Sequence, residues 1–463
     1  MGFRTRIEDI AGALRTELGP TCRLAGPVVL AELGWMAMGI VDTMMVGRIG
    51  PEAIGAVSIG NALFHTLSLF GVGLLLGLDT LVSQAYGAGD AEDCHHSLLQ
   101  AIYLSLLLTP LLMAVILLSI PFLREWGLHP DVVEGSVSYA KLVTWSLLPF
   151  MLFTALRRYL QGMGLVQPIM LVLLTANLVN ALANWVLVFG RFGAPAMGVE
   201  GAALATLLSR CYMFGGLVFY IVRREHLAEI WGIPRKFDPA RIRALVGLGF
   251  PAAIQIGLEV GVFAAATALA GKLSPAILAA HQIALNSAAL CFMVPLGVSA
   301  AGAVRVGQAL GRGDAAGARW SGWAALLLGA AFMLGAGVVF LVAPRLIIEM
   351  YTTDPAVVAT GISLLSIAAA FALFDGVQVV ATGVLRGAGD TRTPMFTNLL
   401  CHWLVGLPVG YLLCFQLDLG AEGLWIGLSL GLIAVALILL FTWARKVNWP
   451  LREVPASVPL GGG

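Results

Sequence analysis

The chain has 463 residues, of which 59% are hydrophobic and 11% charged, and its formal net charge is +1. Soluble globular proteins carry about 25% charged residues, so this composition excludes that class and indicates a polytopic membrane protein. The near-neutral balance argues against a nucleic-acid partner. None of the six cysteines belongs to a CxxC pair and most lie in apolar runs, which predicts buried apolar side chains rather than a disulfide framework or a zinc site.

The first residues mix arginines with acids and lack both an apolar core and a cleavage site, so we expect no removable signal peptide. We expect residues 1–20 to form a cytoplasmic segment, in which a short amphipathic helix lies on the membrane surface.

Twelve apolar runs follow, each long enough to cross a bilayer as a helix. They lie at 24–47, 53–84, 97–123, 136–156, 165–190, 196–222, 244–271, 275–304, 320–344, 356–385, 394–417 and 421–444. The predicted fold is therefore all-α, with twelve transmembrane helices.

The distribution of lysine and arginine predicts the orientation. An even number of spans places both termini on one side, and the connections on that side carry twenty of the 27 basic residues, against five on the other side. Lys141 and Arg210 fall inside predicted spans. The positive-inside rule then predicts cytoplasmic termini in the plasma (cell inner) membrane, surrounded by lipid.

The two halves of the chain resemble each other. GRIGPEAIGAVSIG (47–60) aligns with GKLSPAILAAHQIA (271–284), and VSQAYGAGD (82–90) aligns with VGQALGRGD (306–314), both at a shift of 224. We therefore expect two six-helix lobes related by a pseudo-two-fold axis along the membrane normal, with a cleft between them. A monomer contains both lobes, and we expect a monomer.

The repeat also predicts the domain boundaries. The N-lobe spans 21–222 and the C-lobe spans 244–445. The charge-rich segment 223–243 is predicted to be a cytoplasmic linker, and 446–463 a cytoplasmic tail.

Two isolated acids mark the second half. Glu259 is the one charge in 244–271, and Asp375 is the one charge in 356–385. A carboxylate held in hydrocarbon costs a few kcal/mol or more, so both are candidates for a site that exchanges a proton or a sodium ion for an organic cation. Phe371, one turn before Asp375, and the i, i+4 pair Gln282 and Asn286 are candidate neighbours. The alternative is that each acid is hydrogen-bonded to an adjacent helix for packing.

The first half has its own polar candidates. Asp42 lies in the first span, Asn180 and Asn184 are one turn apart in the fifth, and Thr206 is in the sixth. Carboxylate, amide and hydroxyl oxygens suit a hard cation such as sodium, although interhelical hydrogen bonding is the alternative.

For the other polar residues we expect mainly structural roles. Glu32 either faces the cleft or pairs with Lys141 or Arg210. Asp79 and Arg305 are expected to close salt bridges or fix the geometry of the lobes, and the lone histidines His65 and His281 are expected to be packing residues. The sequence shows no nucleotide-binding loop, metal-ligand cluster or nucleophile triad, so we expect no cofactor, no ATP drive and no enzyme.

Five segments carry a family resemblance, which spans about 20–445. They are MGIVDTMMVGRIGPEAIGAVSIGN (38–61), GLDTLVSQAYGAGD (77–90), GFPAAIQIGLEVGVF (249–263), AAHQIALNSAALCFMVPLGVSAAGAVRVGQALGRGD (279–314) and FDGVQVVATGVLRGAGDTRTP (374–394). With them the chain resembles the multidrug and toxic compound extrusion (MATE) transporters, most closely the NorM type. The resemblance implies two lobes around a V-shaped cleft, and export of cationic amphipathic drugs in exchange for sodium or protons.

The resemblance also assigns site residues. It implies a C-lobe cation site at Glu259 and Asp375, and an N-lobe site at Asp42, Asn180, Asn184 and Thr206. Position 184 is an acid in some relatives, and Phe371 replaces a tyrosine of some relatives, so the coupling ion stays open, with the C-lobe acids favouring sodium. The nearest rival function is a lipid-linked oligosaccharide flippase, which predicts a basic cleft. A polytopic membrane enzyme and a passive channel are two further rival functions.

Overall fold

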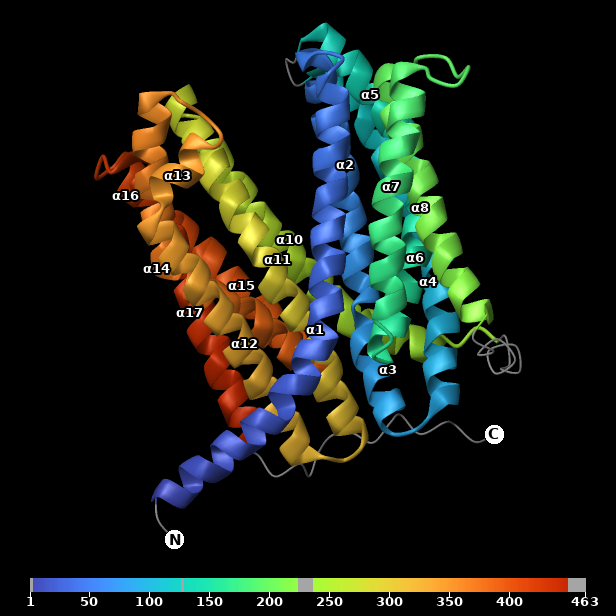
Figure 1. The fold of residues 1–463 in the computed structure, drawn as a ribbon, viewed down its shortest axis with the longest axis vertical. Helices are drawn as coiled ribbons and strands as arrows, with labels where there is room; N and C mark the ends of the chain where they lie inside the picture. Colours follow the sequence, from blue (N-terminus) through green and yellow to red (C-terminus); the bar gives the residue numbers. More distant parts are fainter. Residues whose placement is uncertain (1–2, 126–128, 224–235, 449–463) are drawn as a thin grey trace.

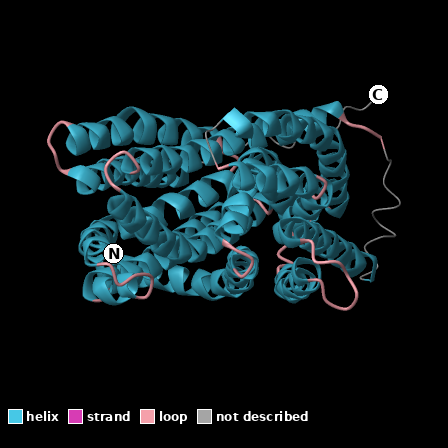
Figure 2. Cartoon of the chain, turned by 90° about the horizontal axis from the view of Figure 1, so that it is seen from above, coloured by secondary structure: helices cyan, strands magenta, loops and turns pink. Residues whose placement is uncertain are grey.

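The structure is a computed structural model that describes residues 3–125, 129–223 and 236–448, and these residues form helices and short connections without a strand (Figure 2). Eleven helices are long and apolar enough to cross a membrane, and the count is twelve when the bent pair 130–144 and 147–162 is taken as one span. The predicted all-α fold with twelve spans is therefore confirmed. The connection 224–235 and the tail after 448 lie outside the described residues.

The first half of the chain contains these elements: α1 (Phe3–Gly47), α2 (Pro51–Leu75), α3 (Gly77–Gly87), α4 (Ala91–Ser119), a 3-10 segment (Ile120–Glu125), α5 (Pro130–Thr144), α6 (Leu147–Gly162), α7 (Gln167–Phe189) and α8 (Gly198–Arg223). The second half contains these: α10 (Pro239–Ala270), α11 (Pro275–Gly311), α12 (Ala315–Val342), α13 (Pro344–Glu349), α14 (Pro355–Gly387), α15 (Arg392–Asn398), a π-helical segment (Leu399–Gly406), α16 (Leu407–Phe415) and α17 (Gly420–Asn448).

The internal repeat is visible in the helix boundaries. Pro51–Gly87, which comprises α2 and α3, and Pro275–Gly311, which is α11, both contain 37 residues. The next helix of each half is capped in the same way, because Asp90 accepts a hydrogen bond from Asp93 N and Asp314 accepts one from Gly317 N. A side-chain acceptor at this position satisfies one of the free N–H groups at the start of a helix. The halves therefore repeat in structure at the shift that the sequence indicates.

The halves form two lobes (Figure 1). Helices α1–α8 make up the N-lobe and α10–α17 the C-lobe, and the lobes diverge toward the end of the molecule that carries α13 (Figure 1). Toward the opposite end, which we call the closed end, α3 packs against α11 and α14. Thr80 Oγ1 on α3 donates to Arg386 O on α14 over 2.6 Å, and Gln84 Nε2 donates to Gly387 O over 3.1 Å. Direct helix contact therefore joins the lobes at this end.

Helix α1 runs without a break from Phe3, although it contains Pro20 and Pro27. The first residues are therefore helical and continuous with the first span. Glu17 forms an ion pair with Arg305 of α11 and accepts a hydrogen bond from Ser321 Oγ of α12 at 2.7 Å. These contacts fix the beginning of the chain against the C-lobe, and they give Arg305 a salt-bridge partner.

Candidate functional site

A cavity of about 530 Å³ lies between the lobes. Its walls come from α1, α2 and α6 of the N-lobe and from α10, α11, α14 and α17 of the C-lobe. We call it the central cavity. Its volume is in the range that holds a drug-sized ligand.

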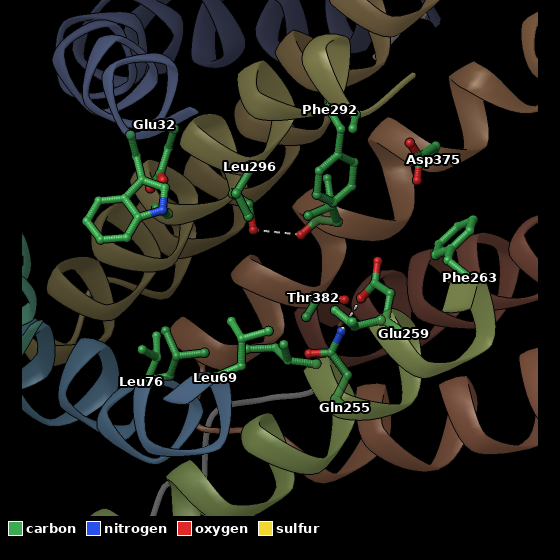
Figure 3. Close-up of a pocket in the computed structure, with 18 of the residues that line it drawn as sticks. Glu32, Leu69, Leu76, Gln255, Glu259, Phe263, Phe292, Leu296, Asp375 and Thr382 are labelled. Atoms are coloured by element: carbon green, nitrogen blue, oxygen red, sulfur yellow. Dashed lines mark hydrogen bonds between the residues drawn. The ribbon is translucent and has the colours of Figure 1, made fainter. Parts of the chain in front are cut away.

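The two acids of the C-lobe both line the central cavity. Glu259 on α10 and Asp375 on α14 reach it from different helices, with Phe263 and Phe292 nearby (Figure 3). Gln255 Nε2 donates to Glu259 Oε2 over 2.8 Å, and Gln378 Nε2 donates to Glu259 Oε1 over 3.1 Å. No described residue donates a hydrogen bond to Asp375. The pair therefore offers one carboxylate held by two amides and a second that faces the cavity without a donor among the described residues.

An aromatic wall adjoins the acids. Phe371, one turn from Asp375, lines the cavity, and its ring centroid lies 6.1 Å from that of Trp425 on α17. Trp425 Nε1 donates to His281 Nδ1 over 2.9 Å, and His281 Nε2 lies 2.9 Å from Thr267 Oγ1. His281 is thus fixed by two hydrogen bonds, and it also lines the cavity. Rings beside carboxylates suit flat organic cations.

Gln282 and Asn286 lie away from the central cavity. His281, Leu285 and Phe292 line it, whereas Gln282 and Asn286 are not among its lining residues. Gln282 is half-buried outside the cavity, and Asn286 is exposed on another face of α11.

The four polar residues of the N-lobe come together in a separate cluster. Asn184 Nδ2 donates to Asp42 Oδ1 over 2.6 Å and also lies 3.2 Å from Asn180 Oδ1. Thr206 Oγ1 lies 3.5 Å from Asp42 Oδ2. Both asparagines are fully buried, and Asn184 Oδ1 has no hydrogen-bond donor among the described residues. Asp42 does not line the central cavity.

The end of the central cavity nearest α3, which we call the floor, is built from arginines. Arg157 and Arg158 of α6 and Arg386 of α14 all line the cavity. We counted these residues in cytoplasmic connections, and we took Lys141 and Arg210 as the basic residues of the spans. The expectation that Lys141 and Arg210 are the basic residues near the cleft is wrong. The three arginines line the cavity instead, because α6 continues to Gly162 and α14 to Gly387.

Lys141 and Arg210 do not line the central cavity. Lys141 is exposed. Arg210 is buried inside the N-lobe, where its guanidinium carbon lies 4.3 Å from the ring centroid of Phe64. Neither of them pairs with Glu32, which lines the cavity and forms an ion pair with Arg157. Asp79 pairs with Arg158 and Arg386. Asp79 and Arg305 therefore each form ion pairs, with partners other than each other.

No group of three or more His, Cys, Asp and Glu side chains among the described residues is arranged to hold a metal ion. A sodium ion at either polar site would need amide, hydroxyl or water oxygens in addition to carboxylate. Asn184 Oδ1 and Gln378 Oε1 are buried oxygens of this kind, and neither accepts a hydrogen bond from a residue that the structure describes.

The MatE family model matches residues 27–186 and 251–412. The probable multidrug resistance protein NorM of Mesorhizobium japonicum is 36% identical over 441 residues, which cover 93% of this chain and 94% of that protein. The multidrug resistance protein PmpM of Pseudomonas aeruginosa is 36% identical over 450 residues, which cover 95% of this chain and 94% of that protein. The crystal structure of the eukaryotic MATE transporter AtDTX14 matches with a TM-score of 0.83 at 23% identity, over 94% of this chain and 99% of that chain.

The fold therefore agrees with a solved MATE transporter, and the sequence agrees with NorM proteins over nearly its whole length. The family consists of membrane transporters and not of enzymes, and its members need no cofactor. The chain belongs to the MatE family of multidrug and toxic compound extrusion transporters, and it is NorM-like.

Proposed function

We propose that this protein is a secondary active multidrug efflux transporter, which exports cationic amphipathic compounds in exchange for Na⁺ or H⁺. The observation that carries the proposal is the meeting of Glu259, Asp375 and the aromatic wall in one cavity between the lobes. Carboxylates attract the charge of an organic cation, and rings of Phe371 and Trp425 favour its flat apolar part.

Coupling follows if the small cation and the drug compete for the same carboxylates. A proton or sodium ion that neutralises Glu259 or Asp375 weakens the attraction for the drug and favours its release. A drug that binds after the cation has left favours the other arrangement of the lobes, because a ligand shifts an equilibrium only by its differential affinity for the two states. With cytoplasmic termini, the closed end faces the cytoplasm and the described arrangement opens outward.

The N-lobe cluster is a second candidate for the coupling cation. The carboxylate of Asp42 accepts a hydrogen bond from the amide nitrogen of Asn184, whose buried Oδ1 has no donor among the described residues, so the cluster contains oxygens of the kinds that sodium prefers. Because this cluster lies apart from the central cavity, a cation bound there would act on the drug site through movement of the N-lobe helices.

The decisive experiment is ethidium efflux from proteoliposomes, driven separately by a sodium gradient and by a pH gradient. We expect driven efflux by the wild type, and its loss in Glu259→Gln and Asp375→Asn. Efflux that persists in both variants would remove the C-lobe acids from the coupling mechanism and leave Asp42 as the candidate. Absence of driven efflux under either gradient would favour the lipid-linked oligosaccharide flippase.

A further inference from the structure

One span of the C-lobe is not a regular α-helix. The span Arg392–Phe415, which we call the interrupted span, consists of α15, the π-helical segment and α16. Pro408 near the start of α16 accounts for the interruption, because proline lacks an N–H donor and its ring displaces the carbonyl one turn before it. The interrupted span has 24 residues, whereas α7, its counterpart in the N-lobe, is an α-helix of 23. Short π-helical turns are frequent at functional sites, so the side chains of this segment are candidates for a functional role.

The π-helical segment carries Trp403, which contacts α10 beside Glu259. Trp403 Nε1 donates a hydrogen bond to Leu258 O over 2.9 Å, and Leu258 directly precedes Glu259. A Cβ atom added at Gly261 would lie 3.0 Å from Trp403 Cζ2, so the indole ring lies close to the backbone of α10 at this glycine. The indole therefore holds the turn of α10 that carries the acid, by a hydrogen bond and by packing.

The turn of α10 around Glu259 is weakly supported by its own sequence. Gly257 and Gly261 lie two residues before and two residues after the acid, and neither has a side chain that could pack against a neighbouring helix. Pro251 lies inside α10. Because proline removes one hydrogen bond of the helix, the part of α10 beyond Pro251 can bend or rotate with respect to the part before it. The direction in which Glu259 points therefore depends on contacts with other helices.

Two such contacts act at different ends of the acid. Gln255 donates to Glu259 from α10 itself and therefore moves with it. Gln378 of α14 holds the carboxylate, whereas Trp403 of the interrupted span holds the backbone one residue before the acid. The contact with Trp403 fixes the helix, and the contact with Gln378 fixes the side chain.

The N-lobe contains the same contact at the equivalent position. Asn177 Nδ2 on α7 donates to Gly34 O on α1 over 2.9 Å. Gly34 and Leu258 are related by the shift of 224 that relates the two halves. Asn177 and Trp403 also correspond, because each lies nine residues after the first proline of its span. In both lobes the fifth span therefore holds one carbonyl of the first span, with an amide as donor in the N-lobe and an indole in the C-lobe.

We propose that Trp403 is a positioning residue for Glu259: its indole N–H anchors α10 at the residue before the acid, and so sets the rotation at which the carboxylate faces the central cavity (Figure 3). The inference rests on the proposed function, in which Glu259 attracts the organic cation. The residue after the held carbonyl is Trp35 in the N-lobe, so the proposed role concerns the acid of the C-lobe alone.

The first measurement follows the position of the acid without a drug. A water-soluble carbodiimide couples glycine methyl ester to accessible carboxyl groups as an amide, and mass spectrometry of the digested full-length protein gives the labelling rates of Glu259 and Asp375 separately. Trp403→Phe keeps an aromatic ring and removes the N–H donor. We expect it to slow the labelling of Glu259 about threefold or more and to leave Asp375 unchanged, because α14 does not depend on this hydrogen bond. Unchanged labelling of Glu259 in Trp403→Phe would overturn the proposal.

The second measurement is ethidium polarisation in a double-mutant cycle with the purified protein. We expect Trp403→Phe to weaken ethidium about fivefold when Glu259 is present, and less than about twofold in the Glu259→Gln background. The effect should disappear because the second background lacks the carboxylate that is positioned. Equal weakening in both backgrounds would show that Trp403 only supports the fold, and would overturn the proposal.

Gly261→Ala tests the same contact from α10, because it keeps the indole and pushes the ring away from the helix. We expect it to weaken ethidium about threefold. Gly257→Ala is the matched control, since a Cβ atom at this glycine of the same helix meets nothing within 4 Å. Trp185→Phe controls for the loss of an indole, because Trp185 is an exposed tryptophan on α7. Equal ethidium affinity in Gly257→Ala and Gly261→Ala would contradict an anchor at this turn.

The two measurements also separate this inference from the proposed function. If Glu259→Gln binds ethidium as the wild type does while Trp403→Phe slows the labelling of Glu259, the proposed role of the acid fails and the positioning role of Trp403 stands. If Glu259→Gln weakens ethidium and Trp403→Phe changes neither labelling nor binding, the proposed role of the acid stands and the positioning role fails.

Discussion

Gln378 and Glu259 connect two helices of the C-lobe, because Gln378 Nε2 on α14 donates a hydrogen bond to Glu259 Oε1 on α10 over 3.1 Å. These residues are 119 positions apart in the chain. Gln255, one turn before Glu259 on its own helix, donates to the other carboxylate oxygen. The orientation of the acid at the centre of the cavity thus depends on an amide from another helix.

The first prediction concerns this amide. Gln378→Leu keeps a buried side chain of similar size and removes the donor to Glu259. A hydrogen bond to a charged group contributes about 1.5–3 kcal/mol, so we expect ethidium binding to weaken roughly tenfold or more. Ethidium polarisation with the purified protein measures the effect. If Gln378→Leu binds ethidium as the wild type does, the contact between α10 and α14 does not position the acid.

Gln282 and Asn286 provide the matched control and a prediction of their own. They are polar residues on α11, but the cavity face of that helix carries His281 and Leu285 instead. We expect Gln282→Leu and Asn286→Ala to keep ethidium binding and efflux within twofold of the wild type. A large loss in either variant would show that α11 rotates during transport and presents its other face to the cavity.

The third prediction concerns the aromatic wall. Phe371→Leu keeps much of the apolar volume and removes the ring beside Asp375. Cation–π contacts contribute about 0.5–2 kcal/mol, so ethidium affinity is expected to fall roughly twofold to thirtyfold, whereas Phe371→Tyr retains it. Phe441→Leu is the control, because Phe441 is an exposed phenylalanine on α17. Equal effects at positions 371 and 441 would contradict a direct contact between Phe371 and the dye.

The fourth prediction concerns the N-lobe cluster. Asn184 Nδ2 lies 2.6 Å from Asp42 Oδ1, so Asn184→Asp places two carboxylates in contact. Two adjacent negative charges repel unless a cation lies between them, and this variant should therefore bind sodium more tightly. We expect efflux to reach half its maximal rate at a sodium concentration several times lower than in the wild type. Asn177→Asp on the same helix is the control, because Asn177 donates to Gly34 O instead. An unchanged sodium dependence in Asn184→Asp would argue that the cluster only packs helices.

The acids could be predicted from the sequence because a charge inside an apolar run is costly and therefore conspicuous. Glu259 and Asp375 are such charges, and both line the cavity. At helix ends, by contrast, hydropathy hides charged residues, because a charge there is taken as the end of the apolar run. It ended two predicted spans at residues 156 and 385, so Arg157, Arg158 and Arg386 were counted as loop residues, whereas their helices continue and the side chains reach the floor.

The sequence does not indicate which residues reach the cavity through packing between distant helices. The contact of Trp425 with His281 joins α17 to α11, and nothing in either segment indicates it. The choice between His281 and Gln282 for the cavity face depends on the rotation of α11, which spacing within one helix cannot determine. We selected Gln282 and Asn286 because they are polar. In the structure, the face of α11 with His281 and Leu285 lines the cavity instead.

The last prediction concerns the closed end, where the absence of a side chain at Gly87 lets α3 lie close to α11. A Cβ atom added at Gly87 would lie 2.1 Å from Gln308 O, which is a backbone atom and cannot move alone. Gly87→Ala must therefore push the helices apart, at a cost of about 1–3 kcal/mol. We expect a lower unfolding temperature in detergent and slower driven efflux, because the lobes cannot close fully at this end. Gly215→Ala is the matched control, since a Cβ atom at this helical glycine meets nothing within 4 Å. If the two variants were equally stable and active, closure at α3 and α11 would not be required for transport.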